Sequence, residues 1–167
     1  DETVLTIYED VTDLEISGFT FKNGEIGIEA PDSFTDATIN IHDVVVTDND
    51  SEGIYFSGAT DSTLTFTNVA VTNNGNDDGD DGIYLSGDSA SLSNSTTTIT
   101  DSEITSNNGN GIYVNRLLNG STFTVEGTTI GGPSSAGNGE NGIYVNDAED
   151  SAINIRDNNV ISWNDES

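Results

Sequence analysis

The chain has 167 residues, enough for one domain with a sizeable hydrophobic core. Its 30 acidic and three basic residues give a formal net charge of −27, which argues against nucleic acid and anionic lipid surfaces as partners, because like charges repel. The chain contains no cysteine, which excludes disulfides and thiolate chemistry, and no apolar run approaches the ~18 residues that membrane insertion as a helix requires.

A Gly-Ile-Tyr motif recurs along the chain at a nearly constant spacing. Its isoleucines are Ile54, Ile83, Ile112 and Ile143, which lie 29, 29 and 31 residues apart. A further step of 28 residues toward the N-terminus reaches Ile26, in a degenerate copy at residues 24–28, and another step reaches residues 4–7. Self-similarity at a period of about 20–50 residues is typical of repeat architectures. The spacing therefore predicts six coils of 28–31 residues.

Each copy contains three segments in which apolar and polar residues alternate. The first is the Gly-Ile-Tyr segment, and the second covers residues 38–41, 63–66, 96–99, 122–125 and 152–155. The third follows two residues later, with expected inward side chains at Phe19/Phe21, Val44/Val46, Val69/Val71, Ser102/Ile104, Thr128/Ile130 and Asn158/Val160. Period-two alternation bounded by Gly, Asn and Asp predicts three short strands per coil. Three strands in about 29 residues are too few for a propeller blade, which favours a parallel solenoid.

The repeated pattern resembles the right-handed parallel β-helix superfamily, the pectate-lyase-like solenoids, over essentially the whole chain. The resemblance implies an all-β, right-handed parallel β-helix, which we expect to form a single domain over residues 1–167. That family stacks asparagines in one turn, and the matching positions here are Asn23, Asp48, Asn73 and Ser106. Gly132 and Ser162 depart from the pattern, so the ladder is expected to break near the C-terminal end. The superfamily includes polysaccharide lyases and hydrolases, surface adhesins and phage tailspikes, so the fold alone decides no function.

The tyrosines of the motif are expected to point away from the core. In a strand, successive side chains alternate between the two faces, so each tyrosine points opposite to the isoleucine beside it. The expected outward row contains Tyr55, Tyr84, Tyr113 and Tyr144, with Ser57, Ser86, Asn115 and Asn146 two residues further on. Such a row either stabilises neighbouring strands by aromatic pairing or forms a rail that binds a neutral glycan.

A second outward row consists of threonines. It contains Thr63/Thr65, Thr96/Thr98 and Thr122/Thr124, preceded by Thr38. The row resembles the T-x-T arrays of β-solenoid ice-binding proteins, which gives ice binding as a minor alternative. Exposed threonine is also ordinary in strands.

One turn carries a dense group of carboxylates, and three turns carry glycosylation sequons. Asp77, Asp78, Asp80 and Asp81 place four carboxylates within five residues, and hard oxygen ligands at that density suit Ca²⁺. The alternative is a solvated acidic turn on an acid-rich protein. The Asn-x-Ser/Thr sequons are at Asn49, Asn94 and Asn119, where a secreted chain can carry glycans.

The sequence gives little support for catalysis, and we assign no catalytic residue. The chain has one histidine, His42, expected to be outward and solvated, and its three bases, Lys22, Arg116 and Arg156, fall in different coils. Pairs of carboxylates at the separation that glycosidases use arise by chance among 30 acids.

The leading hypothesis is an extracellular or cell-surface structural element, an adhesin-like rod or filament, with Ca²⁺ as a candidate stabilising ion. Neither end of the chain offers an obvious polar cap, so we expect a segment of a longer protein, or a subunit that self-associates end to end. The acidity resembles that of halophilic proteins. The alternative is a carbohydrate-active module that binds or cleaves a neutral polysaccharide along the tyrosine row.

Overall fold

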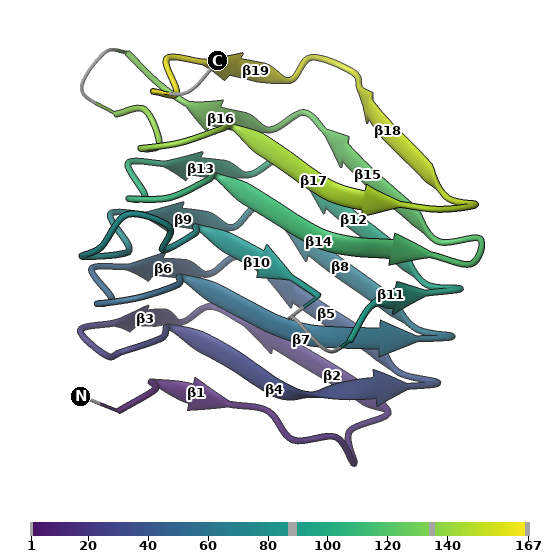
Figure 1. Cartoon of the computed structure of the whole chain (residues 1–167). Helices are drawn as coiled ribbons and strands as arrows, with labels where there is room; N and C mark the ends of the chain where they lie inside the picture. Colours follow the sequence, from purple (N-terminus) through teal and green to yellow (C-terminus); the bar gives the residue numbers. More distant parts are fainter. Residues whose placement is uncertain (1, 87–89, 134–135, 166–167) are drawn as a thin grey trace.

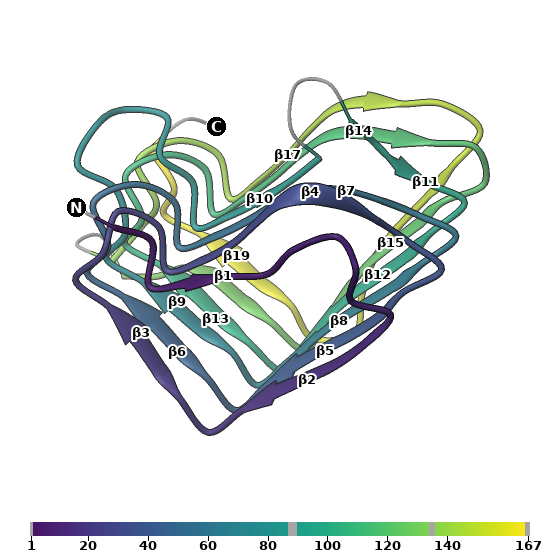
Figure 2. The ribbon, with the colours of Figure 1, turned by 90° about the horizontal axis from the view of Figure 1, so that it is seen from below.

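The computed structural model describes residues 2–86, 90–133 and 136–165, and in these residues the chain winds into stacked coils of parallel strands (Figure 1). Three sheets run along the axis, and every coil gives each sheet a strand. Viewed along the axis, the sheets enclose a common interior (Figure 2). An all-β parallel β-helix of six coils with three strands per coil was predicted, and the structure confirms it.

The three sheets are named A, B and C in the order in which each coil visits them. Sheet A contains β1 (Leu5–Thr6), β4 (Ile28–Thr35), β7 (Ile54–Thr60), β10 (Ile83–Leu85), β11 (Leu92–Ser93), β14 (Ile112–Leu118) and β17 (Ile143–Ala148). Sheet B contains β2 (Asp13–Ser17), β5 (Thr38–His42), β8 (Thr63–Thr67), β12 (Thr96–Thr100), β15 (Thr122–Glu126) and β18 (Ala152–Arg156). Sheet C contains β3 (Thr20–Lys22), β6 (Val45–Thr47), β9 (Ala70–Thr72), β13 (Glu103–Thr105), β16 (Thr129–Gly131) and β19 (Val160–Ser162). Within the described residues, no helix is long and apolar enough to cross a membrane.

The bends between sheets use residues in the left-handed backbone region. Such residues precede sheet B at Asp36, Asp61, Asn94, Asn119 and Asp150; they precede sheet C at Gly18, Asp43, Asn68, Asp101, Gly127 and Asp157; and they follow sheet C at Asn23, Asp48, Asn73 and Ser106. Asn, Asp and Gly adopt this conformation at the lowest cost, because a short polar side chain can bond locally and glycine has no Cβ. The Asn- and Asp-rich turns of the sequence are therefore the corners of the coil.

The register of the first coils differs from the prediction. Ile28, and not Ile26, pairs with Ile54, and Leu5 pairs with Ile28. The first two steps are therefore 23 and 26 residues, shorter than the expected 28–31. Ile28 is fully buried in the interior row, whereas Ile26 lies two residues before it and is only partly buried. Interior packing selects the register, and both isoleucines satisfy the sequence pattern equally well.

Of the predicted inward pairs of the third strand, Asn158/Val160 is wrong and Phe19/Phe21 is wrong in part. In the last coil, Ile161 pairs with Ile130, and Val160 is an exposed residue that pairs with Thr129. The shift arises because Asp157 is followed by a second left-handed residue, Asn158, so this corner is one residue longer. In the first coil, Phe19 is 61% exposed because no coil lies beneath it in the described chain.

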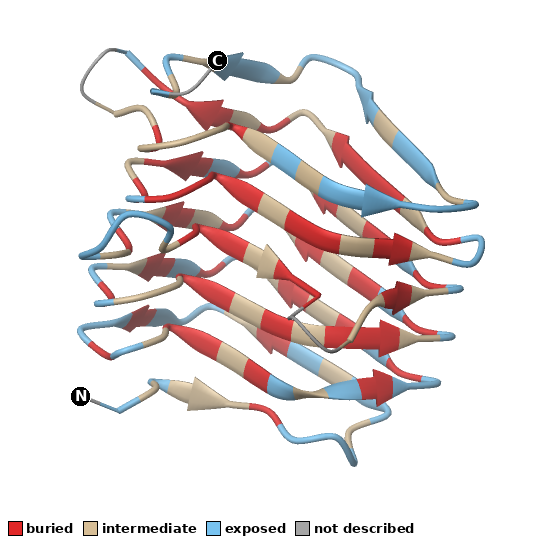
Figure 3. Cartoon of the chain, viewed as in Figure 1, coloured by how far each residue is buried: buried red, intermediate tan, exposed pale blue. Residues whose placement is uncertain are grey.

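The interior of the middle coils is apolar and tightly enclosed (Figure 3). Ile54, Ile83 and Ile112 have no exposed surface, and their neighbours Tyr55, Tyr84 and Tyr113 point outward and are half-buried. The predicted alternation of the motif is confirmed. Figure 3 also shows that the last coil is largely exposed, which matters for the ends of the molecule.

The two faces of the motif predict unequal effects of substitution. We expect Ile112→Ala to lower the free energy of unfolding by ~2–5 kcal/mol, because it opens a cavity between stacked coils. Tyr113→Thr is expected to cost about 1 kcal/mol or less, because only ring stacking is lost and threonine favours strands. Chemical denaturation measures both values, and equal losses would contradict the assigned faces.

Candidate functional site

The interior corner after sheet C carries a continuous asparagine ladder. Its members are Asn49, Asn74, Asn107, Asn138 and Asn164. Each of the first four donates from Nδ2 to the Oδ1 atom of the next, over 2.8–3.0 Å. The backbone N–H of each donates to the same oxygen over 3.1–3.3 Å. The ladder thus joins five consecutive coils through buried amides, where each bond is stronger than in water.

The ladder differs from its prediction in position and in extent. The predicted residues, Asn23, Asp48, Asn73 and Ser106, are the left-handed corner residues, and the ladder residue follows one position later. The ladder also does not break near Gly132 or Ser162, because Asn138 and Asn164 continue it. The prediction was wrong by one residue because both positions favour asparagine, one for its backbone and the other for its side chain.

At the other two corners, shorter ladders of hydroxyl groups accept hydrogen bonds from the buried backbone N–H groups. The N–H groups of Ala37, Ser62 and Ser95 each donate to the serine hydroxyl of the next coil over 3.0–3.1 Å. At the corner before sheet C, the N–H of Val69 donates to Ser102 and that of Ser102 to Thr128. All three corners therefore follow one rule, in which a buried N–H meets a polar side chain from the coil above.

The glycine of the Gly-Ile-Tyr motif leaves room for the asparagine ladder. A Cβ atom on Gly53 would lie 2.8 Å from Nδ2 of Asn74 and 2.7 Å from the carbonyl oxygen of Gly82. Any side chain here would push neighbouring coils apart. In the motif, the glycine thus leaves space for the ladder, the isoleucine packs in the interior and the tyrosine points outward.

The ladder gives a test of what holds the coils together. We expect Asn107→Ala to lower the free energy of unfolding by roughly 2–3 kcal/mol, because the buried N–H and Nδ2 of Asn74 lose their acceptor. Asn108→Ala is the matched control, since Asn108 is the exposed neighbour, and we expect a change below about 0.5 kcal/mol. Urea denaturation compares them, and similar losses would show that the ladder contributes no particular stability.

The tyrosine row forms as predicted, and its rings pack on one another. Tyr84 and Tyr113 are stacked with ring centroids 4.8 Å apart, and Tyr113 and Tyr144 are stacked at 5.2 Å. Tyr55 meets Tyr84 edge to face at 5.3 Å. Rings that cover each other in this way leave their edges, and few faces, for a sugar to stack on. The geometry therefore favours the packing interpretation of the row over the glycan rail.

The polar residues beside the tyrosines differ in burial and in hydrogen bonding. Asn146 donates to Asn115 over 3.0 Å, and the Tyr113 hydroxyl donates to the same oxygen over 3.3 Å. Asn115 is nearly buried, Ser57 is half-buried, and Ser86 is fully buried with its hydroxyl bonded to the carbonyl of Ala90. The structure brings the Asn115 and Asn146 side chains together but withdraws Ser86 from the surface.

The threonine row is in register on sheet B but short. Thr63, Thr96 and Thr122 pair in sequence, as do Thr65, Thr98 and Thr124. Thr124 is buried, and the rows end at Ala152 and Asn154. Ice binding stays a prediction, with only three coils of paired threonines on the face.

The acidic turn does not gather its four carboxylates. Asp77 and Asp78 are exposed, while the Asp80 carboxylate accepts the N–H groups of Asn76 and Asp77 over 3.1 and 2.9 Å. Asp81 points the other way, into the molecule. In the described part of the chain, no group of three or more acidic or histidine side chains converges to hold a metal ion.

Asp81 is a buried carboxylate that sequence reasoning assigned to the surface. It is 1% exposed, and its Oδ1 atom accepts the N–H of Asn110 over 2.7 Å and the Nδ2 of Asn110 over 2.9 Å. Burial raises the pKa of Asp81 to about 7, and the charges of Glu52 and Glu140 contribute to that rise, against the lowering effect of the bonds from Asn110. Asp81 lies two residues before Ile83, as Asn110 lies two residues before Ile112. This equivalence in the repeat was the sequence signal that could have identified Asp81 as a buried residue.

The three sequons have different environments. Asn49 is a buried member of the asparagine ladder, which argues against a glycan there in the folded chain. Asn94 and Asn119 are exposed corner residues, and Asn94 donates to Asp61 while Asn119 donates to the Ser93 hydroxyl over 2.9 Å.

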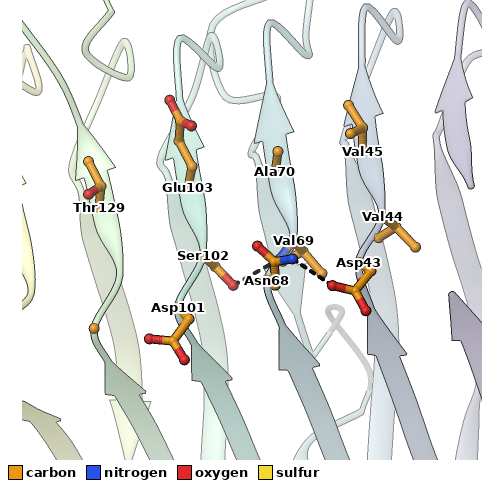
Figure 4. Close-up of a pocket in the computed structure, with 11 residues that line it drawn as sticks. Asp43, Val44, Val45, Asn68, Val69, Ala70, Asp101, Ser102, Glu103 and Thr129 are labelled. Carbon is orange, nitrogen blue, oxygen red and sulfur yellow. Dashed lines mark hydrogen bonds between the residues drawn. The ribbon is translucent and has the colours of Figure 1, made fainter. Parts of the chain in front are cut away.

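A groove of about 500 Å³ follows the corner between sheets B and C (Figure 4). Val45 and Ala70 lie on one side of it, and Asp43, Asn68 and Asp101 lie along the corner. Asn68 donates to Asp43 over 2.6 Å, which lowers the pKa of that carboxyl, with a smaller contribution from His42. In turn Asp43 raises the pKa of His42. The groove is acidic and open, and no sequence motif had identified it.

The comparisons with known proteins agree with this geometry. The family model described as a right-handed β-helix region matches residues 6–167. The chain belongs to the right-handed β-helix family. Searches of curated proteins and of solved structures found no match. Membership in the family agrees with the coiled architecture and does not decide a function.

Proposed function

We propose that the chain is a structural element of an extracellular rod or fibre, in which its coils stack end to end on those of a second copy. The observation that carries the proposal is that the first and the last described coils leave apolar side chains of the interior rows exposed. Repeat proteins that stay monomeric cover their terminal repeats with polar faces.

The last described coil leaves residues of the interior rows exposed. Ile153, Ile155 and Ile161 are 42%, 47% and 45% exposed, although they continue the fully buried interior rows of Phe123, Val125 and Ile130. Ile155 and Ile161, together with Trp163, line a depression of about 350 Å³. Exposed apolar residues grouped in this way mark association surfaces.

The N-terminal end offers a complementary face. Leu5, Val11, Leu14 and Ile16 line an apolar depression of about 370 Å³ in the first coil. The upper side of every coil already binds the lower side of the next, so the two ends suit each other in a head-to-tail contact.

Charge also favours contact at the ends over contact at the sides. Two of the three basic residues of the chain, Lys22 and Arg156, lie in the first and last coils. If a second copy continues the register of sheet B, Arg156 faces Ser17 and lies beside Glu15 of that copy. The acidic sides repel each other, which supports axial rather than lateral growth.

The extracellular setting is part of the proposal. The exposed sequons at Asn94 and Asn119 are compatible with it. An acidic surface with few lysines suits a protein that keeps its hydration in high salt. A glycan-binding role along the tyrosine row is the less favoured alternative, because its rings stack on each other.

Head-to-tail association predicts complementation between two blocked variants. We expect the chain to sediment as a concentration-dependent series of oligomers at about 1 M NaCl, where the Debye length of ~3 Å screens repulsion. Ile155→Lys blocks the C-terminal face and Leu14→Lys the N-terminal face, so each variant alone is expected to be monomeric. Mixing the two restores dimers, because each still carries one open face.

The control for this experiment is Asn154→Lys, which adds the same charge to the same strand but not to the interior row. It is expected to keep the oligomers. A wild-type chain that stays monomeric at high concentration, or dimers that persist in Leu14→Lys alone, would contradict head-to-tail stacking.

The acidic surface predicts stabilisation by salt. Thirty acids against three bases repel one another, so the melting temperature should rise with NaCl. Because the acidic turn does not gather three ligands, we expect CaCl₂ and MgCl₂ at equal ionic strength to raise it equally. A larger rise with Ca²⁺ that disappears in Asp77→Asn/Asp78→Asn would instead establish the calcium site predicted from the sequence.

A further inference from the structure

A second amide ladder crosses the corner two residues before each interior isoleucine. Asn141 donates from its N–H and its Nδ2 to Oδ1 of Asn110, over 3.2 and 3.0 Å. Asn110 donates from the same two groups to Oδ1 of Asp81, over 2.7 and 2.9 Å. Each residue therefore uses its oxygen as acceptor for the coil above and its Nδ2 as donor.

The next position down this ladder is Glu52. Ile54 pairs with Ile83, so Glu52 precedes its isoleucine by the same two residues as Asp81 does. The backbone N–H of Gly53 donates to the carbonyl of Asp81 over 3.1 Å, which places the two coils in contact at this point. By the pattern of the ladder, residue 81 has to donate toward Glu52. An aspartate side chain has a donor only when it is protonated.

The charged groups around this position are all acidic in the described chain. Glu52 lies in the coil below Asp81. Glu140 lies two coils above Asp81, in the coil above Asn110, and accepts from Nδ2 of Asn110 over 2.9 Å. On the same turn, Asp80 accepts the Ser51 hydroxyl over 3.4 Å, and that hydroxyl also donates to Glu52 over 2.6 Å. A buried carboxylate beside two others, with no cation among its neighbours, favours holding a proton.

We infer that Asp81 and Glu52 share one proton, and that this proton fastens the acidic turn to the coil below it. The protonated Asp81 hydroxyl donates to the Glu52 carboxylate, while its other oxygen keeps both bonds from Asn110. Loss of the proton places two negative charges close together within the ladder and removes the donor that connects Asp81 to Glu52. The turn that contains Asp77, Asp78 and Asp80 is then repelled from the coil beneath it.

The sign of the pH dependence follows from the direction of the shift. Burial raises the pKa of Asp81 to about 7, above the value near 4 of an unfolded aspartate, so the folded chain binds the extra proton between these limits. The stability that this proton contributes is present at acidic pH and is lost as the pH rises through about 7.

The experiment compares thermal unfolding from pH 5 to pH 9 at fixed ionic strength. We expect the melting temperature of the wild-type chain to fall from pH 5 to about pH 7 and to level off above it. Asp81→Asn supplies a permanent donor and is expected to show no such fall and to be the more stable protein above pH 8. Asp78→Asn, an exposed change in the same turn, is the control and keeps the wild-type fall. Parallel curves for wild type and Asp81→Asn would overturn the inference.

A second measurement separates a shared proton from simple repulsion. The side-chain carboxyl carbon of Asp81 reports its protonation by NMR, and Glu52→Gln and Glu140→Gln each remove one nearby charge. Sharing predicts a larger shift of the Asp81 midpoint toward acid in Glu52→Gln than in Glu140→Gln. Equal shifts would show that Asp81 binds its proton alone, and a midpoint near pH 4 in the wild-type chain would remove the site.

Discussion

The corners of the β-helix turn backbone N–H groups into the interior, and these groups constrain the rest of the structure. A buried N–H without a partner costs free energy comparable to a lost hydrogen bond. The strands cannot satisfy it, because the left-handed residue before it has ended the sheet. The chain therefore places Asn, Ser or Thr at the inward position after most of these bends, and the side chain accepts a hydrogen bond from the N–H of the coil below it. Coil length, register and the glycine of the motif all accommodate these ladders.

This constraint explains how much of the fold the sequence predicts. The alternation of Ile83, Tyr84 and Leu85 depends on local strand geometry alone, so the interior and exterior faces could be assigned correctly. The ladder could not be positioned to the residue, since Asn73 and Asn74 are chemically identical and differ only in backbone conformation and direction. For the same reason the pattern could not choose between Ile26 and Ile28, because only stacking on Ile54 distinguishes them.

The candidate sites were harder to predict than the fold, because each depends on which way one side chain points. Asp80 and Asp81 are adjacent acids in one turn, yet Asp80 caps the turn while Asp81 enters the interior. Composition suggested a common metal site for both. Similarly, Asn49 begins an Asn-x-Ser sequon, but its side chain is part of the buried asparagine ladder. Rows of repeated residues were predictable, whereas the departures from repetition, where this chain differs from a generic β-helix, needed the three-dimensional register.

The ladders also give the β-helix a direction. In the asparagine ladder every amide donates toward the C-terminal end. Asn164, the last member, accepts from Asn138. Within residues 2–86, 90–133 and 136–165, no group accepts a hydrogen bond from the Nδ2 atom of Asn164. At the other end, the N–H of Gly24 donates to Asn49, but glycine has no side chain to receive a bond from below. The two ends therefore offer different chemistry, so contact between unlike ends is the geometry that continues the strands in parallel. The asparagine ladder stops at such a junction, and the apolar rows of sheets A, B and C continue across it. Backbone hydrogen bonds and hydrophobic burial would then hold the junction without the amide ladder, and its strength depends on salt because both copies are strongly acidic.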